Sequence, residues 1–572
     1  MKKYLLVLVS LCCALLPALA EHPEYPELKK SDANIIGHVL DKKTSEHLPY
    51  ITIALKGTTI GTVTDATGHY FLKNLPEGNF MMEVSSVGYK TVTRSVTLKK
   101  GKTLEENFEL EEDAIALDGV VVSANRSETT RRLAPTLVNV VDLKLFETTN
   151  SSTLSQGLNF QPGVRVETNC QNCGFQQVRI NGLDGPYTQI LIDSRPVFSA
   201  LSGVYGLEQI PASMIERVEV MRGGGSALFG SSAIAGTINI ITKEPLRNSG
   251  QLSHTITSIG GSSAFDNNTS LNASLVTDDH RAGLYIFGQN RHRSGYDYDG
   301  DGFTELPKLK NQTVGFRSYL KTSTYSKLTF EYHHMQEFRR GGDMLDRPPH
   351  EAHIAEQLQH SIDGGSLKYD YFSPNEKNRL SVFASAANTD RDSYYGPGND
   401  PLKAYGKTTD LTAMGGAQYV HTFDKCLFMP SDLTVGLEYN RDRLKDNMWG
   451  YDRHTDQTVK VYSAFLQNEW KNKHWGILIG GRLDKHNMVD DVIFSPRANL
   501  RFNPTDNINL RLSYSSGFRA PQAFDEDMHI ENVGGTVAMI ERAKDLKEEK
   551  SQSFSASADM YHRFGAFQTN LL

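Results

Sequence analysis

Histidine and arginine side chains that could bind an iron-containing ligand gather within residues 337–360. Imidazole can coordinate haem iron, and the arginine guanidinium attracts an anionic ferric chelate. These residues predict a substrate-binding loop, and a solvated loop without a ligand is the alternative interpretation. His353 and Glu356 also have the spacing of a metal pair, but the sequence offers no evident third ligand. The candidate loop residues are Arg339, Arg340, His350 and His353.

A second group of side chains has the spacing of a calcium-binding loop. Asp297, Asp299 and Asp301, followed by Gly302, copy the first half of an EF-hand, including its turn glycine. Position 12 of such a loop would be Lys308 rather than a bidentate glutamate, which removes a major ligand. Calcium bound at the three aspartates is therefore one interpretation, and a polar, aspartate-rich loop tip is the other. No other cofactor is expected.

The beginning of the sequence has the pattern of an export signal. Residues 1–20 contain two lysines, an apolar run and the small-x-small ending Ala18-Leu19-Ala20. A lipoprotein signal at Cys12 or Cys13 is the weaker alternative, because the residue before a lipidated cysteine is usually small. The mature chain is expected to start at Glu21.

Two cysteines of the exported chain are close in sequence. Cys170 and Cys173 stand as C-Q-N-C between turn-forming residues. Outside the cytosol such a pair more often forms a local disulfide than a metal site. A zinc site would need further ligands, and none lies nearby in the sequence. A thioredoxin-like motif would need a surrounding βαβ pattern, which is absent. We therefore predict a Cys170–Cys173 disulfide.

The composition excludes several classes of protein. The 60 Lys and Arg residues against 67 Asp and Glu residues give a net charge of −7, too near balance for a nucleic-acid binder. With 39% hydrophobic residues, the chain lacks the repeated runs of about 20 apolar residues that membrane helices need. A membrane β-barrel needs apolar residues only at alternate positions and remains compatible. No catalytic constellation is evident, so an enzyme is not expected.

The elements that must position these residues begin with a small β-domain. Between residues 34 and 112, short β-prone runs alternate with turn signals, which predicts an antiparallel sandwich. The segments TDATGHYFL, LPEG and SSVGY resemble the carboxypeptidase-regulatory-like domain, which implies an accessory and non-catalytic role. Residues 116–126, ALDGVVVSANR, then form an apolar, β-prone strand between polar flanks. Such a strand can pair with the sheet edge of another protein, and an ordinary linker is the alternative.

The segment after this strand resembles the plug domain of TonB-dependent outer-membrane receptors. The resemblance rests on FQQVRINGLDGPYTQILIDSRPV at 175–197 and RVEVMRGGGSALFGSSAIAGTINIITK at 217–243. It implies a plug over residues 127–245 and makes residues 116–126 the TonB box. The residues expected to couple to TonB are Leu117, Asp118, Gly119, Val120, Val121 and Val122. The residues expected to hold the plug in the barrel by charge pairing are Arg179, Arg217, Glu219 and Arg222.

Residues 246–572 have the pattern of a transmembrane β-barrel. Ile508, Leu510 and Leu512 alternate with Asn509 and Arg511, so that one face suits lipid and the other a watery lumen. Short connections near 373, 472–474 and 503–506 alternate with long ones near 291–311, 337–360, 391–408 and 516–548. We count about 14 strands, whereas the resemblance implies a barrel of about 22. The sequence is therefore expected to be truncated at its C-terminal end.

The expected fold is mainly β: an Ig-like sandwich, an α+β plug and part of a 22-stranded antiparallel transmembrane barrel. The resemblance implies an outer-membrane receptor that takes up a scarce metal chelate actively, with a ferric siderophore as the first candidate. Haem or cobalamin is the alternative ligand. His529 is a further candidate substrate residue that points to haem, because it follows the motif GFRAP as in haem receptors, although the motif expected after it is degraded. A TonB-linked signalling receptor and a passive surface-binding protein are two further functions that the sequence allows. The expected partners are TonB with ExbB and ExbD, outer-membrane lipid, the chelate and a surface lipoprotein.

Overall fold

The structure is a computed structural model, and most of the chain is β-strand. It describes residues 30–571 except 50, 66, 87–88, 112–119, 171, 197–207, 209, 278, 397–403, 524–529, 534–535, 540, 542, 544 and 565–566. The predicted signal peptide at 1–20 and His529 lie outside the described residues. Within the described ranges, no helix is both long and apolar enough to cross a bilayer.

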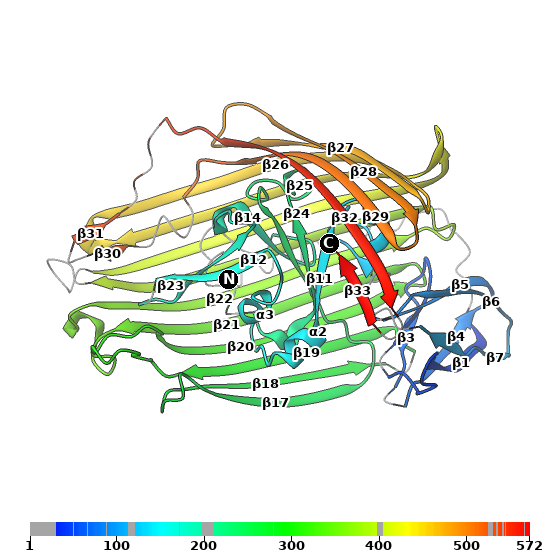
Figure 1. Cartoon of the computed structure of the whole chain (residues 1–572), viewed down its shortest axis with the longest axis horizontal. Helices are drawn as coiled ribbons and strands as arrows, with labels where there is room; N and C mark the ends of the chain where they lie inside the picture. The colour runs from blue at the N-terminus through cyan, green and yellow to red at the C-terminus, as the bar shows by residue number, and fades with distance from the viewer. Residues whose placement is uncertain are drawn as a thin grey trace.

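The N-terminal part is a sandwich of two four-stranded sheets (Figure 1). Alternate residues of its strands are buried, as in β4, where Tyr70 and Leu72 face the core. Two layers of such strands enclose a single apolar cluster. One sheet contains β1 (Lys30–Asp41), β4 (His69–Pro76), β7 (Thr103–Glu105) and β8 (Phe108–Leu110). The other contains β2 (Thr52–Leu55), β3 (Gly61–Val63), β5 (Gly78–Ser85) and β6 (Val92–Leu98).

The plug is built around a second, smaller sheet in the order β11-β15-β16-β14. Strand β15 (Ile215–Arg222) pairs antiparallel with both β11 (Val138–Asp142) and β16 (Gly236–Thr242), and β14 (Thr188–Ile192) pairs parallel with β16. Its buried apolar residues form the plug core. The remaining plug elements are β9 (Val120–Val121), β10 (Thr129–Thr130), η1 (Arg131–Leu133), α2 (Leu143–Thr148), α3 (Leu154–Leu158), β12 (Val164–Cys170), β13 (Phe175–Ile180), η2 (Gly185–Tyr187), η3 (Ala212–Met214) and α5 (Ser226–Phe229).

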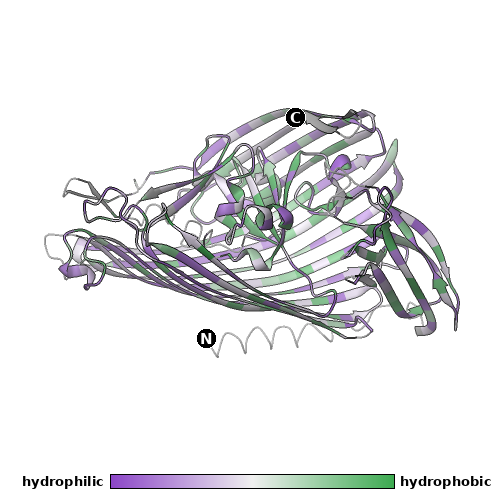
Figure 2. Ribbon diagram, turned by 60° about the horizontal axis from the view of Figure 1, so that its bottom comes forward, coloured by the Kyte–Doolittle hydropathy of each residue, from purple (hydrophilic) through white to green (hydrophobic). Residues whose placement is uncertain are grey.

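A 15-stranded antiparallel sheet curves around the plug, which lies within its hollow (Figures 1 and 2). Its strands pair in chain order from β17 to β29, followed by β32 and β33. They are β17 (Ser249–Ser258), β18 (Phe265–Val276), β19 (Ala282–Arg293), β20 (Lys308–Ser323), β21 (Ser326–Gly342), β22 (Ala355–Phe372), β23 (Asn378–Gly396), β24 (Tyr405–Cys426), β25 (Met429–Met448), β26 (Arg453–Lys471), β27 (Trp475–His486), β28 (Ile493–Thr505), β29 (Ile508–Arg519), β32 (Glu549–Phe564) and β33 (Phe567–Leu571). The loops contain η4 (Pro349–Glu351), η6 (Trp449–Tyr451), β30 (Glu531–Val533) and β31 (Thr536–Ala538).

The curved sheet is apolar outside and polar inside, as the alternating sequence pattern predicts. Leu437 and Leu512 are 63% and 56% exposed, whereas Glu438 and Arg511 are buried at 7% and 3%. Figure 2 shows hydrophilic and hydrophobic residues alternating along the strands. In a water-soluble protein this distribution would be inverted, so the outer face suits lipid. The predicted fold class is confirmed.

The sandwich contacts the end of the curved sheet that carries the short turns. The Thr59 N–H donates to the Thr324 carbonyl oxygen at 2.8 Å, in the turn between β20 and β21. The long connections lie at the opposite end. The loop predicted at 337–360 is shorter in the structure, because β21 continues to Gly342 and β22 begins at Ala355.

Candidate functional site

The described end of the predicted TonB box is attached to the plug by a buried carboxylate. Glu219 is fully buried, and its Oε2 accepts from the N–H groups of Val122 and Ser123 at 2.8 and 2.9 Å. The Ser123 hydroxyl donates to the same oxygen at 2.7 Å. Val120 and Val121 form β9, which pairs with β10, whereas residues 117–119 lie outside the described part of the chain. The coupling role of residues 117–122 stays a prediction.

The last residues of the predicted box, Asn125 and Arg126, contact the wall of the barrel. The Asn125 side-chain amide donates to Glu469 at 2.7 Å, and the Arg126 guanidinium forms an ion pair with Glu438 at 2.5 Å. Glu438 also pairs with Arg482 at 2.7 Å. The side chains of Arg126 and Glu438 are both almost fully buried. Because Glu438 belongs to the barrel wall, the pair would separate if the segment around Arg126 moved away from the wall. A displacement of the box would therefore break or strain the contacts of Asn125 and Arg126 with the barrel wall.

A second connection joins the plug to the barrel through Glu208. Its carboxylate lies 3.4 Å from Arg291, 3.3 Å from Arg293 and 2.8 Å from Arg339, which project from β19 and β21. Burial opposes ionisation, but the three arginines outweigh it and lower the pKa of Glu208 to about 2. A third connection is the ion pair between Asp193 of the plug and Arg317 of β20, at 2.6 Å. The sequence had not predicted these pairings, although Asp193 lies in the motif at 175–197 and Arg339 was a candidate loop residue.

The four residues predicted to hold the plug by charge pairing have their observed partners within the plug itself. Arg179 pairs with Glu167 and Asp184. Arg217 pairs with Glu216 and Glu219, and Arg222 donates to the Pro162 carbonyl oxygen. The prediction of plug–barrel pairing for Arg179, Arg217, Glu219 and Arg222 is therefore wrong. The reason is that β15, which carries three of the four, lies between two other strands of the plug sheet.

The candidate substrate-loop residues do not form one exposed group. Arg339 and Arg340 lie in β21 and are 1% exposed, so their placement in a loop is corrected. His350 shares a hydrogen bond with the Tyr405 hydroxyl at 2.8 Å, and His353 contacts Asp343 at 2.6 Å. His353 is exposed, with 74% of its side chain accessible. A role of these histidines in ligand binding stays a prediction.

The predicted calcium loop gathers its carboxylates as expected and adds one more. Ligand oxygens of Asp297, Asp299, Asp301 and Glu305 all lie within 4.8 Å of one another. Asp297 also accepts from the N–H groups of Gly300 and Gly302 at 2.7 and 2.9 Å. These backbone hydrogen bonds can hold the loop in its conformation without a bound ion. Calcium binding therefore stays a prediction.

The predicted disulfide is not formed. Cys170 and Cys173 are both thiols in the structure, so this prediction is wrong. The Cys170 thiol instead donates to a carboxylate oxygen of Glu356 in β22, at 3.2 Å. The spacing of the two cysteines had suggested a disulfide between them. The fold instead brings Glu356, which lies 186 residues after Cys170 in the sequence, next to the Cys170 thiol.

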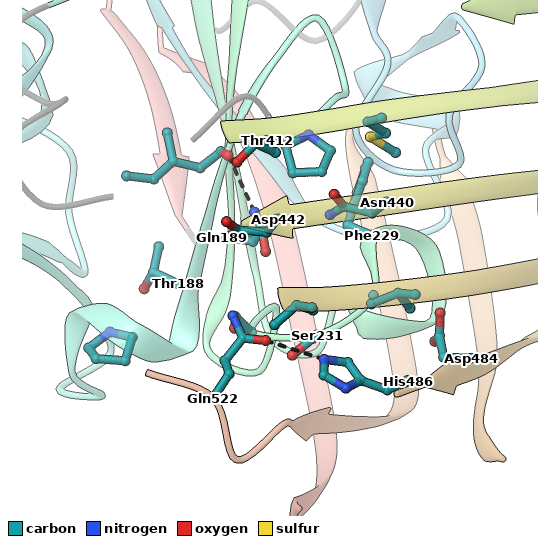
Figure 3. Close-up of a pocket in the computed structure, with 18 of the residues that line it drawn as sticks. Thr188, Gln189, Phe229, Ser231, Thr412, Asn440, Asp442, Asp484, His486 and Gln522 are labelled. Carbon is teal, nitrogen blue, oxygen red and sulfur yellow. Dashed lines mark hydrogen bonds between the residues drawn. The ribbon is translucent and has the colours of Figure 1, made fainter. Parts of the chain in front are cut away.

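A polar cavity of about 180 Å³ lies between the plug and the barrel wall (Figure 3). Figure 3 shows His486 of β27 next to Gln522, with a hydrogen bond of 3.2 Å between them. Gln189 comes from the plug, and Asp442 and Asp484 come from the barrel. Ligand pockets usually measure about 300–1,000 Å³. The volume of this cavity lies below that range.

These features define a class of protein: an outer-membrane β-barrel with a globular plug held inside it. Residues 236–571 match the family described as TonB dependent receptor-like, beta-barrel. Residues 130–237 match the TonB-dependent Receptor Plug Domain, and residues 35–122 match the CarboxypepD_reg-like domain. The chain belongs to the TonB-dependent receptors, a family of outer-membrane receptors and transporters rather than enzymes.

Relatives and solved structures agree with this assignment. The vitamin B12 transporter BtuB of Vibrio vulnificus strain CMCP6 is 24% identical over 426 residues, which cover 71% of this chain and 64% of the relative. BtuB of strain YJ016 is 28% identical over 237 residues, or 36% of this chain and 39% of that protein. The chain thus spans less than two thirds of the length of these relatives.

The solved structures that resemble the chain share its fold. The siderophore receptor PirA from Acinetobacter baumannii has a TM-score of 0.64 and 19% identity, and the match covers 77% of this chain and 70% of PirA. A mutant of the ferric enterobactin receptor PfeA from Pseudomonas aeruginosa has a TM-score of 0.61 and 18% identity, over 76% of this chain and 70% of that one.

Proposed function

We propose that the chain serves energy-coupled uptake of a scarce metal chelate across the outer membrane, with TonB as the energy donor. The observation that carries this proposal is the short path from the box to the barrel. Glu219 holds Val122 and Ser123, and Arg126 then pairs with Glu438 of the wall. A β-strand added to the box by TonB would pull on this path.

The pull would act first on polar contacts such as the ion pair between Arg126 and Glu438. The apolar core around β15 and β16 packs against the wall through Tyr285 and Phe287 of β19, whereas the ion pairs with the wall lie at other places. A plug held by buried ion pairs can release its attachment and keep its own fold, because removing one partner weakens the attachment strongly. ExbB and ExbD are the partners that would energise TonB, and a surface lipoprotein is a further proposed partner.

A ferric siderophore is the first candidate ligand, because the solved structures that share the fold include siderophore receptors. Vitamin B12 is the second candidate, because the related BtuB proteins are vitamin B12 transporters. Haem is the third, and it would use the exposed imidazole of His353.

The ligand is tested in a strain that lacks the receptor and carries the full-length gene on a plasmid. Accumulation of labelled ferric siderophores, cobalamin and haem is measured under limitation for each nutrient. We expect saturable accumulation of iron from a siderophore, and none in the strain with an empty plasmid. Accumulation of cobalamin or haem alone would replace the siderophore by that ligand. Failure of every chelate to accumulate would contradict the proposed function.

A further inference from the structure

Two cysteines form a tight turn at the tip of a plug hairpin. Strand β12 ends at Cys170 and β13 begins at Phe175. The Gly174 N–H donates to the Cys170 carbonyl oxygen at 3.0 Å, and the Cys173 N–H points to the Cys170 sulfur at 3.4 Å. Gly174 has a φ of +69°, a conformation that glycine adopts readily. The turn therefore brings both sulfur atoms close together at the tip of the hairpin.

The barrel supplies a third group to the same place. Glu356, at the start of β22, is 2% exposed, and the Cys170 thiol donates to its Oε2 at 3.2 Å. The two sulfur atoms and a Glu356 oxygen all lie within 4.8 Å of one another. Thiolate and carboxylate bind zinc at about 2.3 and 2.0–2.2 Å in tetrahedral sites. Only small movements would bring all three groups into such a shell.

The surrounding backbone is shaped to keep the three groups together. Gly341 of β21 pairs with Glu356 in the sheet register, and a Cβ at position 341 would overlap the carbonyl oxygen of Asn172. The absent side chain thus lets the cysteine turn approach Glu356. On the other side, Arg339 donates to the Gly174 carbonyl oxygen at 3.2 Å. Gly341 and Arg339 therefore help to place the turn against the barrel wall, although neither offers a metal ligand.

We propose that Cys170, Cys173 and Glu356 form a binding site for a thiophilic divalent cation such as Zn²⁺, shared between the plug and the barrel. Two thiolates select such cations over calcium and magnesium, which prefer oxygen ligands. Binding displaces the thiol protons to solvent and leaves one coordination position for water or another ligand. A bound cation would add a link between the β12–β13 hairpin and β22, at the end of the barrel with the long loops. This inference does not depend on the proposed uptake function.

The test uses the full-length receptor in detergent, reduced and then kept without oxygen, with Co²⁺ and Zn²⁺ as probes. We expect one equivalent of Co²⁺ to give a sulfur-to-cobalt charge-transfer band that Zn²⁺ abolishes. Cys170→Ser and Cys173→Ser should lose the band. Cys426→Ser, which changes the remaining cysteine of the described residues at the end of β24, should keep it.

Two further variants leave both thiols in place, so they separate ligation from folding. Glu356→Gln and Gly341→Ala should each weaken Zn²⁺ binding by at least about tenfold, since even supporting groups around metal sites have effects of this size. X-ray absorption of the zinc-loaded receptor should show two sulfur neighbours at about 2.3 Å. A shell of oxygen and nitrogen alone, no band in the reduced receptor, or equal binding by the oxidised receptor would overturn the proposal.

Discussion

At the scale of single residues, Glu219 stands out because one carboxylate oxygen accepts all three donors offered by Val122 and Ser123. Bonds of this kind to a charged acceptor each contribute about 1.5–3 kcal/mol, and donors left unsatisfied in a buried place cost about 1–3 kcal/mol each. The end of the predicted TonB box is therefore held locally, by a group that a single substitution removes.

Replacing Glu219 by alanine should free the end of the box while the plug sheet stays folded. We expect the amide hydrogens of Val122 and Ser123 to exchange roughly 10- to 100-fold faster, as one lost charged bond implies. Glu216→Gln is the matched control, because Glu216 also lies on β15 and pairs with Arg217 but does not contact the box. Unchanged exchange in Glu219→Ala would contradict the attachment.

Glu208 gives the attachment of the plug a defined dependence on pH. Its pKa is about 2 in the folded receptor, below its ordinary value of 4.5. Its contribution to stability is therefore complete above about pH 4.5 and is lost as the pH falls towards 2. Glu208→Gln should have a lower melting temperature than the wild type at pH 7. This difference in melting temperature should become smaller as the pH decreases from 5 to 3. The measurement is thermal unfolding in detergent, and a difference that stays constant over this range would argue against the three-arginine site.

At the scale of elements, the sandwich meets the barrel at short turns, which include those at His280, Thr324 and Glu376. Gly57 has a φ of +71°, and a Cβ there would collide with the Glu376 side chain in the turn between β22 and β23. Gly101 has a similar φ of +66° in the same domain, but a Cβ there would meet nothing. Replacing either glycine by alanine would therefore cause similar backbone strain. Only the substitution at Gly57 would also introduce a clash with Glu376.

Gly57→Ala should loosen the docking of the sandwich, and Gly101→Ala should not. Spin labels placed on the sandwich and on a barrel turn report the distance between them by pulsed electron resonance in the full-length receptor. We expect a broader and longer distance distribution for Gly57→Ala and a wild-type distribution for Gly101→Ala. Equal distributions for the two variants would show that the contact at Glu376 does not hold the domain.

The sequence predicted the elements better than it predicted their neighbours. Alternation along residues such as Leu510 and Arg511 depends on one strand alone, so the apolar outer face could be foreseen. The partner of Glu219 could not, because the spacing of charges on β15 does not show which segment packs over it. Glu208 was missed for the same reason, and Glu356 was paired with His353 instead of Cys170, because the observed partners come from elements far away in the sequence. The two arginines assigned to a loop lie in β21, since barrel strands can continue beyond the residues that lipid requires.

At the scale of the whole molecule, the central claim is that force applied to the box reaches a plug that otherwise closes the barrel. The sandwich sits at the short-turn end, the box follows it in the chain, and the plug lies inside the curved sheet (Figure 1). Under the proposed function, ligand binding at the long-loop end and coupling at the other end would be separate in space. A change confined to the box should spare the first and abolish the second.

The most direct measurement compares surface binding and accumulation of the labelled chelate in cells that carry the full-length receptor without residues 117–119. This deletion leaves the contacts of Glu219 with Val122 and Ser123, and the Arg126–Glu438 pair, in the chain. We predict wild-type binding at the cell surface and accumulation no higher than in cells without the receptor. Accumulation at the wild-type rate would contradict coupling through this segment and, with it, the account of the protein as an actively driven receptor.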